Sequence, residues 1–248
     1  MNNVQPHFDE ALFSGVIGQE YEMLKLICPL AAEMSLRVGQ AVSEYTARIG
    51  GVLSVLELGG GTGTTTLAIL AASENLKLLS VDNEPTMQNQ AKHRLQNWVD
   101  GQRLSFCGDD ALTALKNTPS DSVNIVASAY TLHNFVDAYR QQVVEEIFRV
   151  LVPGGQFINA DRYALNDVFA HTRAIQKEVS GYFSVLKQLN RIDLLEHWIV
   201  HLFSDESENH LMREASALEQ LVKIGFNSIT LDYRQEVNAL VRAGKPAF

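Results

Sequence analysis

The sequence has few cysteines and no excess of basic residues. Only two cysteines, Cys28 and Cys107, occur among 248 residues. Two cysteines form neither a disulfide framework nor a cysteine-based zinc motif, and the apolar neighbours of each predict a buried, structural thiol. Lys and Arg number 20 against 29 Asp and Glu, so the formal net charge is −9. This acidic balance argues against a surface that follows nucleic-acid phosphates or an anionic membrane, and we predict neither partner.

Long hydrophobic runs are also missing. No stretch approaches the length of a membrane span, and residues Met1 to Pro6 contain no basic region followed by an apolar run. Internal repeats, low-complexity tracts and Pro/Gly-rich linkers are absent as well. A content of 46% hydrophobic and 20% charged residues is typical of a globular protein. We expect a single domain in the cytoplasm.

Strand-like and helix-like segments alternate through the middle of the chain. Short apolar segments with β character are each followed by a segment with helical spacing. This order is typical of a doubly wound, Rossmann-like α/β fold, with a parallel sheet and right-handed crossover helices. The turn Pro153-Gly154-Gly155 is expected to end the last of these helices. The expected strands are 52–58, 76–81, 104–106, 123–127 and 156–159, and the expected helices after the second, third and fourth strands are 86–99, 111–115 and 141–150.

Helical segments flank this α/β core. Residues 1–50 are expected to form an N-terminal helical segment, kinked or broken at Pro29, before a core over residues 51–161. Long helical periodicity over residues 162–209 predicts a cover on the carboxyl ends of the strands, where open α/β sheets bind ligands. Residues 210–248 are expected to complete a seven-stranded sheet with a helix, 210–223, and a hairpin of strands 228–233 and 237–242.

A glycine cluster stands where the first strand meets its helix. The run is Glu57-Leu58-Gly59-Gly60-Gly61-Thr62-Gly63, and a backbone without Cβ atoms lets a ligand lie directly against it. It lacks the third glycine of a dinucleotide fingerprint and the lysine of a P-loop. We expect Gly59, Gly60, Gly61 and Gly63 to contact a cofactor, and Glu57 to order their loop.

Acidic residues follow the next two strands. Asp82 closes the second strand 19 residues after Gly63, where a carboxylate can accept both hydroxyls of a ribose. Asp109 and Asp110 follow the third strand, where a carboxylate can accept from an adenine amino group. Because the two are adjacent, we expect Asp109 to bind the ligand and Asp110 to contribute its backbone. The three strand ends together predict an adenosine site.

With these motifs in order, the chain resembles the class I S-adenosylmethionine-dependent methyltransferases from about Val52 to Arg242. The resemblance extends to Thr131-Leu132-His133-Asn134-Phe135 after the fourth strand and to residues 151–157 before the fifth. It implies that the cofactor is S-adenosylmethionine, with S-adenosylhomocysteine as product. In that family the glycine turn lies against the amino-acid portion of the cofactor.

A narrower resemblance is to the carboxy-S-adenosylmethionine synthase branch. Three stretches carry this resemblance: Asp82-Asn83-Glu84-Pro85-Thr86-Met87, Gly18-Gln19-Glu20-Tyr21, and Gly181-Tyr182 followed by Arg191. It implies contacts of Tyr21, Asn83 and the position of Ala129 with the cofactor. Tyr182 and Arg191 become candidate substrate residues, with the arginine reading a carboxylate across a homodimer. The chain departs from the branch at Gly59-Gly60-Gly61 and at Ala129, where the branch carries Gly-Cys-Ser and asparagine.

The chemistry of methyl transfer demands few catalytic groups. It is a displacement that needs the reactants in line and water excluded, and a base helps when the acceptor is a hydroxyl or a protonated amine. His133 is the candidate base because it follows a strand end that faces the cofactor. The alternative is that His133 caps or packs the loop. For Tyr130, Tyr163 and Tyr182 there are also two interpretations. Each could offer an aromatic face to the positively charged sulfonium, or each could be a residue of the hydrophobic core.

Metal binding has little support in the sequence. His197 and His201 have the i, i+4 spacing of metal ligands, but no Glu follows His197 as in a metalloprotease motif. We therefore predict no metal. Three functions remain open: a methyltransferase acting on a small molecule, which we favour, a carboxy-S-adenosylmethionine synthase-like enzyme that modifies the cofactor, and a cofactor-binding module without catalysis.

Overall fold

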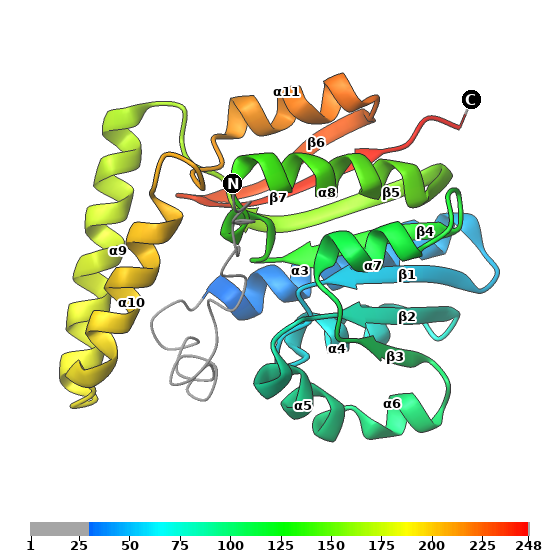
Figure 1. The fold of residues 1–248 in the computed structure, drawn as a ribbon, viewed down its shortest axis with the longest axis horizontal. Coiled ribbons are helices and arrows are strands. Elements are labelled where there is room, and N and C mark those ends of the chain that lie inside the picture. Colours follow the sequence, from blue (N-terminus) through cyan, green and yellow to red (C-terminus); the bar gives the residue numbers. More distant parts are fainter. Residues whose placement is uncertain (1–29, 248) are drawn as a thin grey trace, which may run out of the picture.

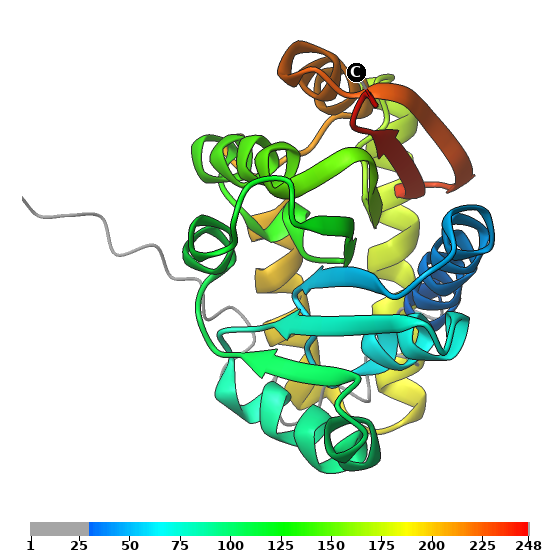
Figure 2. The same cartoon turned by 90° about the vertical axis from the view of Figure 1, so that its right-hand side faces the viewer.

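The computed structural model describes residues 30–247. A seven-stranded sheet with the order β3-β2-β1-β4-β5-β7-β6 carries helices on both faces (Figures 1 and 2). Five neighbouring strands are parallel, and β7 pairs antiparallel with both β5 and β6. The predicted doubly wound α/β fold with a C-terminal hairpin is confirmed.

The parallel strands follow the predicted order closely. They are β1 (Leu53–Leu58), β2 (Leu76–Val81), β3 (Leu104–Cys107), β4 (Val123–Ala129) and β5 (Leu151–Arg162), and the hairpin is β6 (Asn227–Gln235) with β7 (Asn238–Gly244). Side chains alternate between the two faces, as the pleat of a strand requires. In β1, for example, Val55 joins one hydrophobic cluster and Leu56 the other. The sheet therefore separates two cores.

One face of the sheet is covered by α3 (Leu30–Ile49), α4 (Thr64–Ala72) and α6 (Gln96–Asp100). In α3 the fully buried Met34, Val38 and Val42 recur at helical spacing, which turns one stripe of the helix towards the sheet. A Cβ on Gly39 would lie 2.7 Å from the carbonyl oxygen of Ala68, so α3 packs this closely on α4 only because the residue is glycine.

The other face is covered by α7 (Ala111–Asn117), α8 (Asp137–Val150) and α11 (Glu214–Ile224). Val143, Ile147 and Val150 of α8 are fully buried in the same cluster as Phe157 of β5. Removing this much apolar surface from water provides the main stabilisation of the layer. Both layers of helices thus support the strand ends that carry the candidate site.

Two long helices, α9 (Val168–Gln188) and α10 (Ile192–Asp205), form a hairpin between β5 and α11. Figure 1 shows this hairpin beside the ends of the parallel strands towards which their arrows point. Leu186, Leu194, Trp198 and Leu202 give it a small hydrophobic core of its own. It contacts the body of the domain where α10 meets the short 3-10 helix η2 (Leu132–Asn134). We call this hairpin the cover; that it covers a substrate stays a prediction.

Several predicted boundaries were wrong. The single helix expected over 86–99 is two helices, α5 (Pro85–Arg94) and α6, because the chain leaves helical geometry at Leu95, whose side chain packs beside Gly63. The turn Pro153-Gly154-Gly155 does not end α8: the helix stops at Val150, and Leu151 already pairs with Val123 ahead of a register shift in β5. The helix expected from His210 begins at Glu214.

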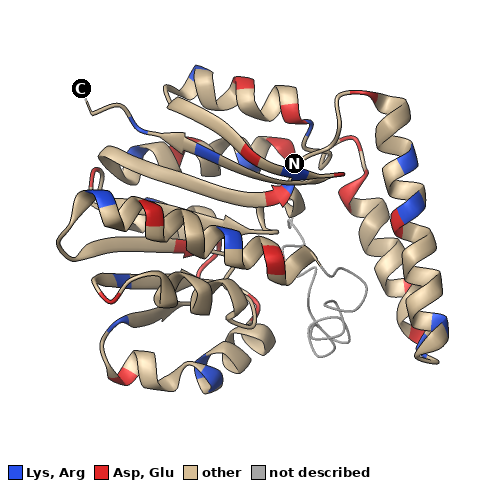
Figure 3. Ribbon diagram, turned by 180° about the vertical axis from the view of Figure 1, so that it is seen from behind, with Lys and Arg blue, Asp and Glu red and all other residues tan. Residues whose placement is uncertain are grey.

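Charged residues of both signs are interspersed over most of the elements seen in Figure 3, including α9, whereas α10 contains acidic residues but no Lys or Arg. Within residues 30–247, no helix combines the length and apolar character needed to cross a membrane.

Candidate active site

The glycine turn follows β1 in left-handed geometry. Gly59, Gly61 and Gly63 have φ angles of 70°, 51° and 87°, which side chains rarely adopt. A Cβ on Gly59 would lie 2.0 Å from Thr131 Oγ1, and one on Gly60 would lie 2.0 Å from Ser80 Oγ. The turn is therefore pressed against the side chains that follow β4 and end β2, and its own fold requires these glycines.

A cavity opens on the other side of this turn. Ala129 and Tyr130, at the end of β4, line it together with the turn and with the start of α3 and of α4. The bare backbone of the glycines forms one wall, so a ligand can approach it closely. Tyr130 has a φ of 53° and donates its hydroxyl to Asn238 Oδ1 at 2.7 Å, which fixes its ring at this wall.

Glu57 lies beneath the turn and is fully buried. Its Oε2 accepts hydrogen bonds from Thr66 Oγ1 at 2.6 Å and Ser80 Oγ at 2.7 Å, which tie α4 and β2 to the end of β1. Burial raises the pKa of the Glu57 carboxyl to about 7, against the lowering effect of the two hydroxyls. Glu57 does not line the cavity, and its hydrogen bonds connect the elements that flank the turn. That Glu57 orders the loop stays a prediction.

Asp82 receives the backbone of the same turn. Its Oδ2 accepts the N–H of Gly61 at 2.6 Å and its Oδ1 the N–H of Glu84 at 2.9 Å. Burial raises the pKa of the Asp82 carboxyl, while these two backbone donors lower it. Asn83, the next residue, is exposed. Asp82 thus ties the glycine turn after β1 to the end of β2.

Asp109 and Asp110 differ in environment. Asp110 caps α7, accepting from the Thr113 N–H at 2.9 Å and the Tyr139 hydroxyl at 2.8 Å. Although burial acts in the other direction, these hydrogen bonds hold the pKa of Asp110 below its usual value. Asp109 is exposed at the end of β3. The division of roles between the two, with Asp109 on the ligand, stays a prediction.

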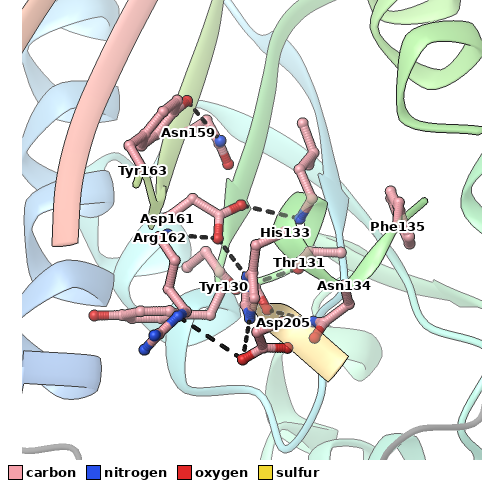
Figure 4. A network of polar contacts seen from close by, with 12 residues as sticks. Tyr130, Thr131, His133, Asn134, Phe135, Asn159, Asp161, Arg162, Tyr163 and Asp205 are labelled. Carbon is pink, nitrogen blue, oxygen red and sulfur yellow. Dashed lines mark hydrogen bonds and ion pairs between the residues drawn. The ribbon is translucent and has the colours of Figure 1, made fainter. Parts of the chain in front are cut away.

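His133 lies in a buried polar network between the strand ends and the cover (Figure 4). Its Nδ1 lies 2.6 Å from Asp161 Oδ1, and its Nε2 lies 3.8 Å from Asp205 Oδ2. The other oxygen of Asp161 accepts the N–H of Leu132 at 2.9 Å, so the carboxylate is held from two directions. His133 is 6% exposed, and its ring points towards α10.

Arg162, at the end of β5, connects both cover helices to the sheet. It pairs with Glu178 of α9 at 2.7 Å, and its other terminal nitrogen lies 3.4 Å from Glu206 just after α10. Glu178 also accepts the hydroxyl of Tyr182 at 2.6 Å, and Glu206 lies 2.6 Å from His171 Nε2. These ionic contacts are buried, where they act through little screening by water.

The remaining predicted residues lie in different places. Tyr182 is buried in this network, whereas Arg191 precedes α10 at the far end of the hairpin and pairs with Asp193 at 3.0 Å. His197 is exposed, and His201, one turn later, faces Asp205. Tyr163 is buried with its hydroxyl 2.8 Å from Asn159 Nδ2, in keeping with its core interpretation. Tyr21 lies outside the described residues.

Several residues of the network were not among the candidates, and Asp161, Arg162 and Asp205 are the ones nearest to His133. Asp161 and Arg162 end a buried strand with two charges in succession, a signal that the sequence does contain. Asp205 ends the apolar helix α10, where a carboxylate gives no sign of facing inwards. Only the packing of the cover brings it to within 4 Å of His133.

Comparison with known proteins gives this arrangement a family context. Residues 55–155 match the family model described as a methyltransferase domain. The chain is 27% identical over 141 residues to an uncharacterized methyltransferase of Geobacillus kaustophilus, covering 55% of this chain and 60% of that protein. It is 25% identical to a carboxy-S-adenosyl-L-methionine synthase of Campylobacter lari, covering 63% of this chain and 66% of that protein. The chain thus spans less than two thirds of the length of these relatives.

Among solved structures, the CurJ carbon methyltransferase superposes with a TM-score of 0.67 at 15% identity, covering 96% of this chain and 61% of that one. This likeness shows the fold. Together the matches confirm the resemblance to class I methyltransferases, whose cofactor is S-adenosylmethionine.

Proposed function

We propose that this chain, which carries a methyltransferase domain of the class I S-adenosylmethionine-dependent superfamily at residues 55–155, transfers a methyl group to a small-molecule acceptor. The proposal depends on one observation, which is that a cavity and a buried polar network lie at the same edge of the sheet. There the glycine-walled cavity lies at the ends of β1 and β4, and the His133 network adjoins it beneath the cover.

The residues at this edge fit the cofactor. The glycine turn would receive its amino-acid portion, Asp82 the ribose and Asp109 the adenine. Ala129 and Tyr130 line the same cavity as the glycine turn. Gly63 lies in the turn between β1 and α4, and Asn83 lies in the turn between β2 and α5. When bound, S-adenosylmethionine supplies an electrophilic methyl group whose carbon–sulfur bond breaks with the electron pair left on sulfur.

The chain's own residues would place the acceptor and keep water out. The cover α9–α10 closes the edge of the sheet, and Arg162 holds it there through Glu178 and Glu206. His133, with Nδ1 fixed by Asp161, presents Nε2 to the space under the cover. In this proposal Nε2 takes the proton of a hydroxyl or ammonium acceptor, and Asp161 is the positioning residue.

Two measurements test the proposal. Calorimetric titration with S-adenosylhomocysteine should show one saturable site, and incubation with S-adenosylmethionine and a broad extract of small metabolites should release S-adenosylhomocysteine together with a methylated product. An absence of saturable binding would refute the cofactor site. Binding without any product would instead indicate a module without catalysis.

A carboxy-S-adenosylmethionine synthase-like activity is the alternative, and the similarity to the Campylobacter lari enzyme favours it. Under this alternative Arg191 and Tyr182 belong to the substrate site, and Arg191→Ala should abolish formation of a carboxylated cofactor. Arg173→Ala, an exposed arginine on α9, is the matched control. Unchanged formation in Arg191→Ala, measured by mass spectrometry, would eliminate the assigned role.

The same proposal includes a cytoplasmic homodimer. Large apolar side chains are exposed on both cover helices, among them Phe169 and Phe183 of α9 and Phe203 of α10, whose exposed fractions are 67%, 49% and 68%. A second copy could cover such surface. Sedimentation of the protein at increasing concentration tests for the dimer.

A further inference from the structure

The network beneath the cover contains a second constellation that methyl transfer does not require. Single ligand atoms of His133, His201 and Asp205 all lie within 4.8 Å of one another. His133 follows β4, whereas His201 and Asp205 lie one turn apart on α10. The two imidazoles and the carboxylate therefore come from opposite sides of the interface between sheet and cover.

We propose that His133, His201 and Asp205 bind a divalent transition-metal ion, of which Zn²⁺ is the best match. The distances His133 Nε2 to Asp205 Oδ2 and His201 Nε2 to Asp205 Oδ1 are both 3.8 Å. These are too long for hydrogen bonds. Ligand atoms about 2.1 Å from a tetrahedral zinc lie roughly 3.4 Å apart, so a small inward movement would suffice.

His133 has a carboxylate on its second ring nitrogen, as the histidines of metal sites usually do. Metal-bound histidines usually donate their second ring N–H to a carboxylate, which fixes the tautomer and the ring. Asp161 Oδ1 lies 2.6 Å from His133 Nδ1 and accepts this hydrogen, which leaves the Nε2 lone pair facing Asp205. Asp161 is itself anchored by the backbone N–H groups of Leu132 and Arg162.

Asp205 supplies an independent observation. Its side chain is only 6% exposed, yet its Oδ1 accepts no hydrogen bond from any residue between 30 and 247. A buried carboxylate oxygen without a hydrogen bond is costly. The nearest guanidinium nitrogen, Arg162 Nε, lies 3.8 Å from the other oxygen, Oδ2. A metal ion between Asp205 and the two imidazoles would satisfy Oδ1.

The charge balance favours a cation at this point. Four buried or half-buried carboxylates gather here, of which two engage the terminal nitrogens of Arg162 and one, Asp161, also interacts electrostatically with the buried guanidinium of Arg140. The four are Asp161, Glu178, Asp205 and Glu206. With neutral histidines the group has an excess of negative charge, which is expensive at low dielectric. A divalent ion would offset most of it.

The choice of metal follows from the ligand types. Two imidazoles and one carboxylate suit zinc and its first-row neighbours, whereas Mg²⁺ prefers oxygen ligands. Three protein ligands leave a coordination position open. Under the proposed function that position would face the acceptor, so the class of acceptor becomes one with an oxygen that a metal ion can deprotonate. His133 would then be a ligand and not a base.

The test titrates the full, tag-free, chelator-treated protein with Co²⁺ as a spectroscopic probe, followed by competition with Zn²⁺. The wild type should bind one equivalent with visible absorption bands that Zn²⁺ abolishes and Mg²⁺ does not. His201→Gln and Asp205→Asn should each weaken Co²⁺ binding by at least about tenfold, and Asp161→Asn by about 10–100-fold. His197→Gln, on the exposed side of the same helix, should bind like the wild type.

The readout separates this inference from the proposed function, because Co²⁺ absorption requires neither cofactor nor turnover. S-adenosylhomocysteine titration of each variant reports independently on folding and on the cofactor site. A wild type that binds no stoichiometric Co²⁺, or binding that persists in both His201→Gln and Asp205→Asn, would overturn the metal site.

Discussion

The buried carboxyl of Glu57 predicts a pH dependence of stability that one variant should remove. Burial raises the pKa of Glu57 from 4.5 in the unfolded chain to about 7 in the native protein. Between these values the native state binds a proton that the unfolded state has lost, so the free energy of unfolding falls as pH rises. The contribution is complete below pH 4.5 and is lost once the pH passes about 7.

The magnitude follows from the two pKa values. One pKa unit corresponds to about 1.36 kcal/mol, so the whole window corresponds to ~3 kcal/mol. Between pH 5.5 and 8.5, where other carboxyl groups are largely ionised in both states, about 2 kcal/mol of it remains to be lost. Glu57→Gln cannot ionise. The variant should therefore gain ~2 kcal/mol relative to the wild type across this range, on top of any constant cost of the substitution.

The assay is urea unfolding of the wild type and of Glu57→Gln at pH 5.5, 7 and 8.5. Glu74→Gln, at an exposed glutamate in the turn before β2, is the matched control and should follow the wild type at every pH. A difference in unfolding free energy between Glu57→Gln and the wild type that stays constant within about 0.5 kcal/mol would refute the reasoning. Glu57 would then be ionised in the native protein.

Three further predictions concern Asp82, the glycine turn and the cover. Asp82→Asn should weaken S-adenosylhomocysteine binding about tenfold or more in calorimetry, since it removes a charged acceptor worth roughly 1.5–3 kcal/mol; unchanged affinity would place the ribose elsewhere. Gly60→Ala should lower stability by about 1–3 kcal/mol because its Cβ would meet Ser80, whereas Gly181→Ala, with open space in mid-helix, should raise it by about 0.5–1 kcal/mol in thermal unfolding. Arg162→Met should accelerate hydrogen exchange in α9 and α10 but not in α7, since it leaves buried carboxylates unpaired; equal protection in both proteins would show that the cover is held otherwise.

The fold was predictable from the sequence because its signals are local. Alternating apolar segments predicted the parallel strands, and β2 has the expected bounds of 76–81. The break at Leu95 was not predictable from helical spacing, since that residue leaves the helix to pack beside Gly63, 32 residues earlier. The bulge after Leu151 likewise depends on pairing with β4.

The candidate site residues also divide into those that a local motif indicates and those that depend on contacts between distant parts of the chain. Gly59, Gly60 and Asp82 could be recognised because each stands at a strand end with a motif around it, and the carboxyl ends of parallel strands meet at one edge. His133 could be named but its partners could not. Asp161 is 28 residues away, and Asp205 is on a helix whose apolar sequence gives no register relative to the sheet.

The sequence by itself determined the doubly wound sheet and the order of motifs along its edge, because strand periodicity and turn glycines act over a few residues. The tertiary structure alone decided which charged groups meet beneath the cover. Pairing of β4 with β5 brings His133 beside Asp161 and Arg162, and the packing of α10 on these strand ends adds Asp205. Burial and distances of 3 to 4 Å across that contact set their chemistry, and no spacing along the chain encodes either quantity.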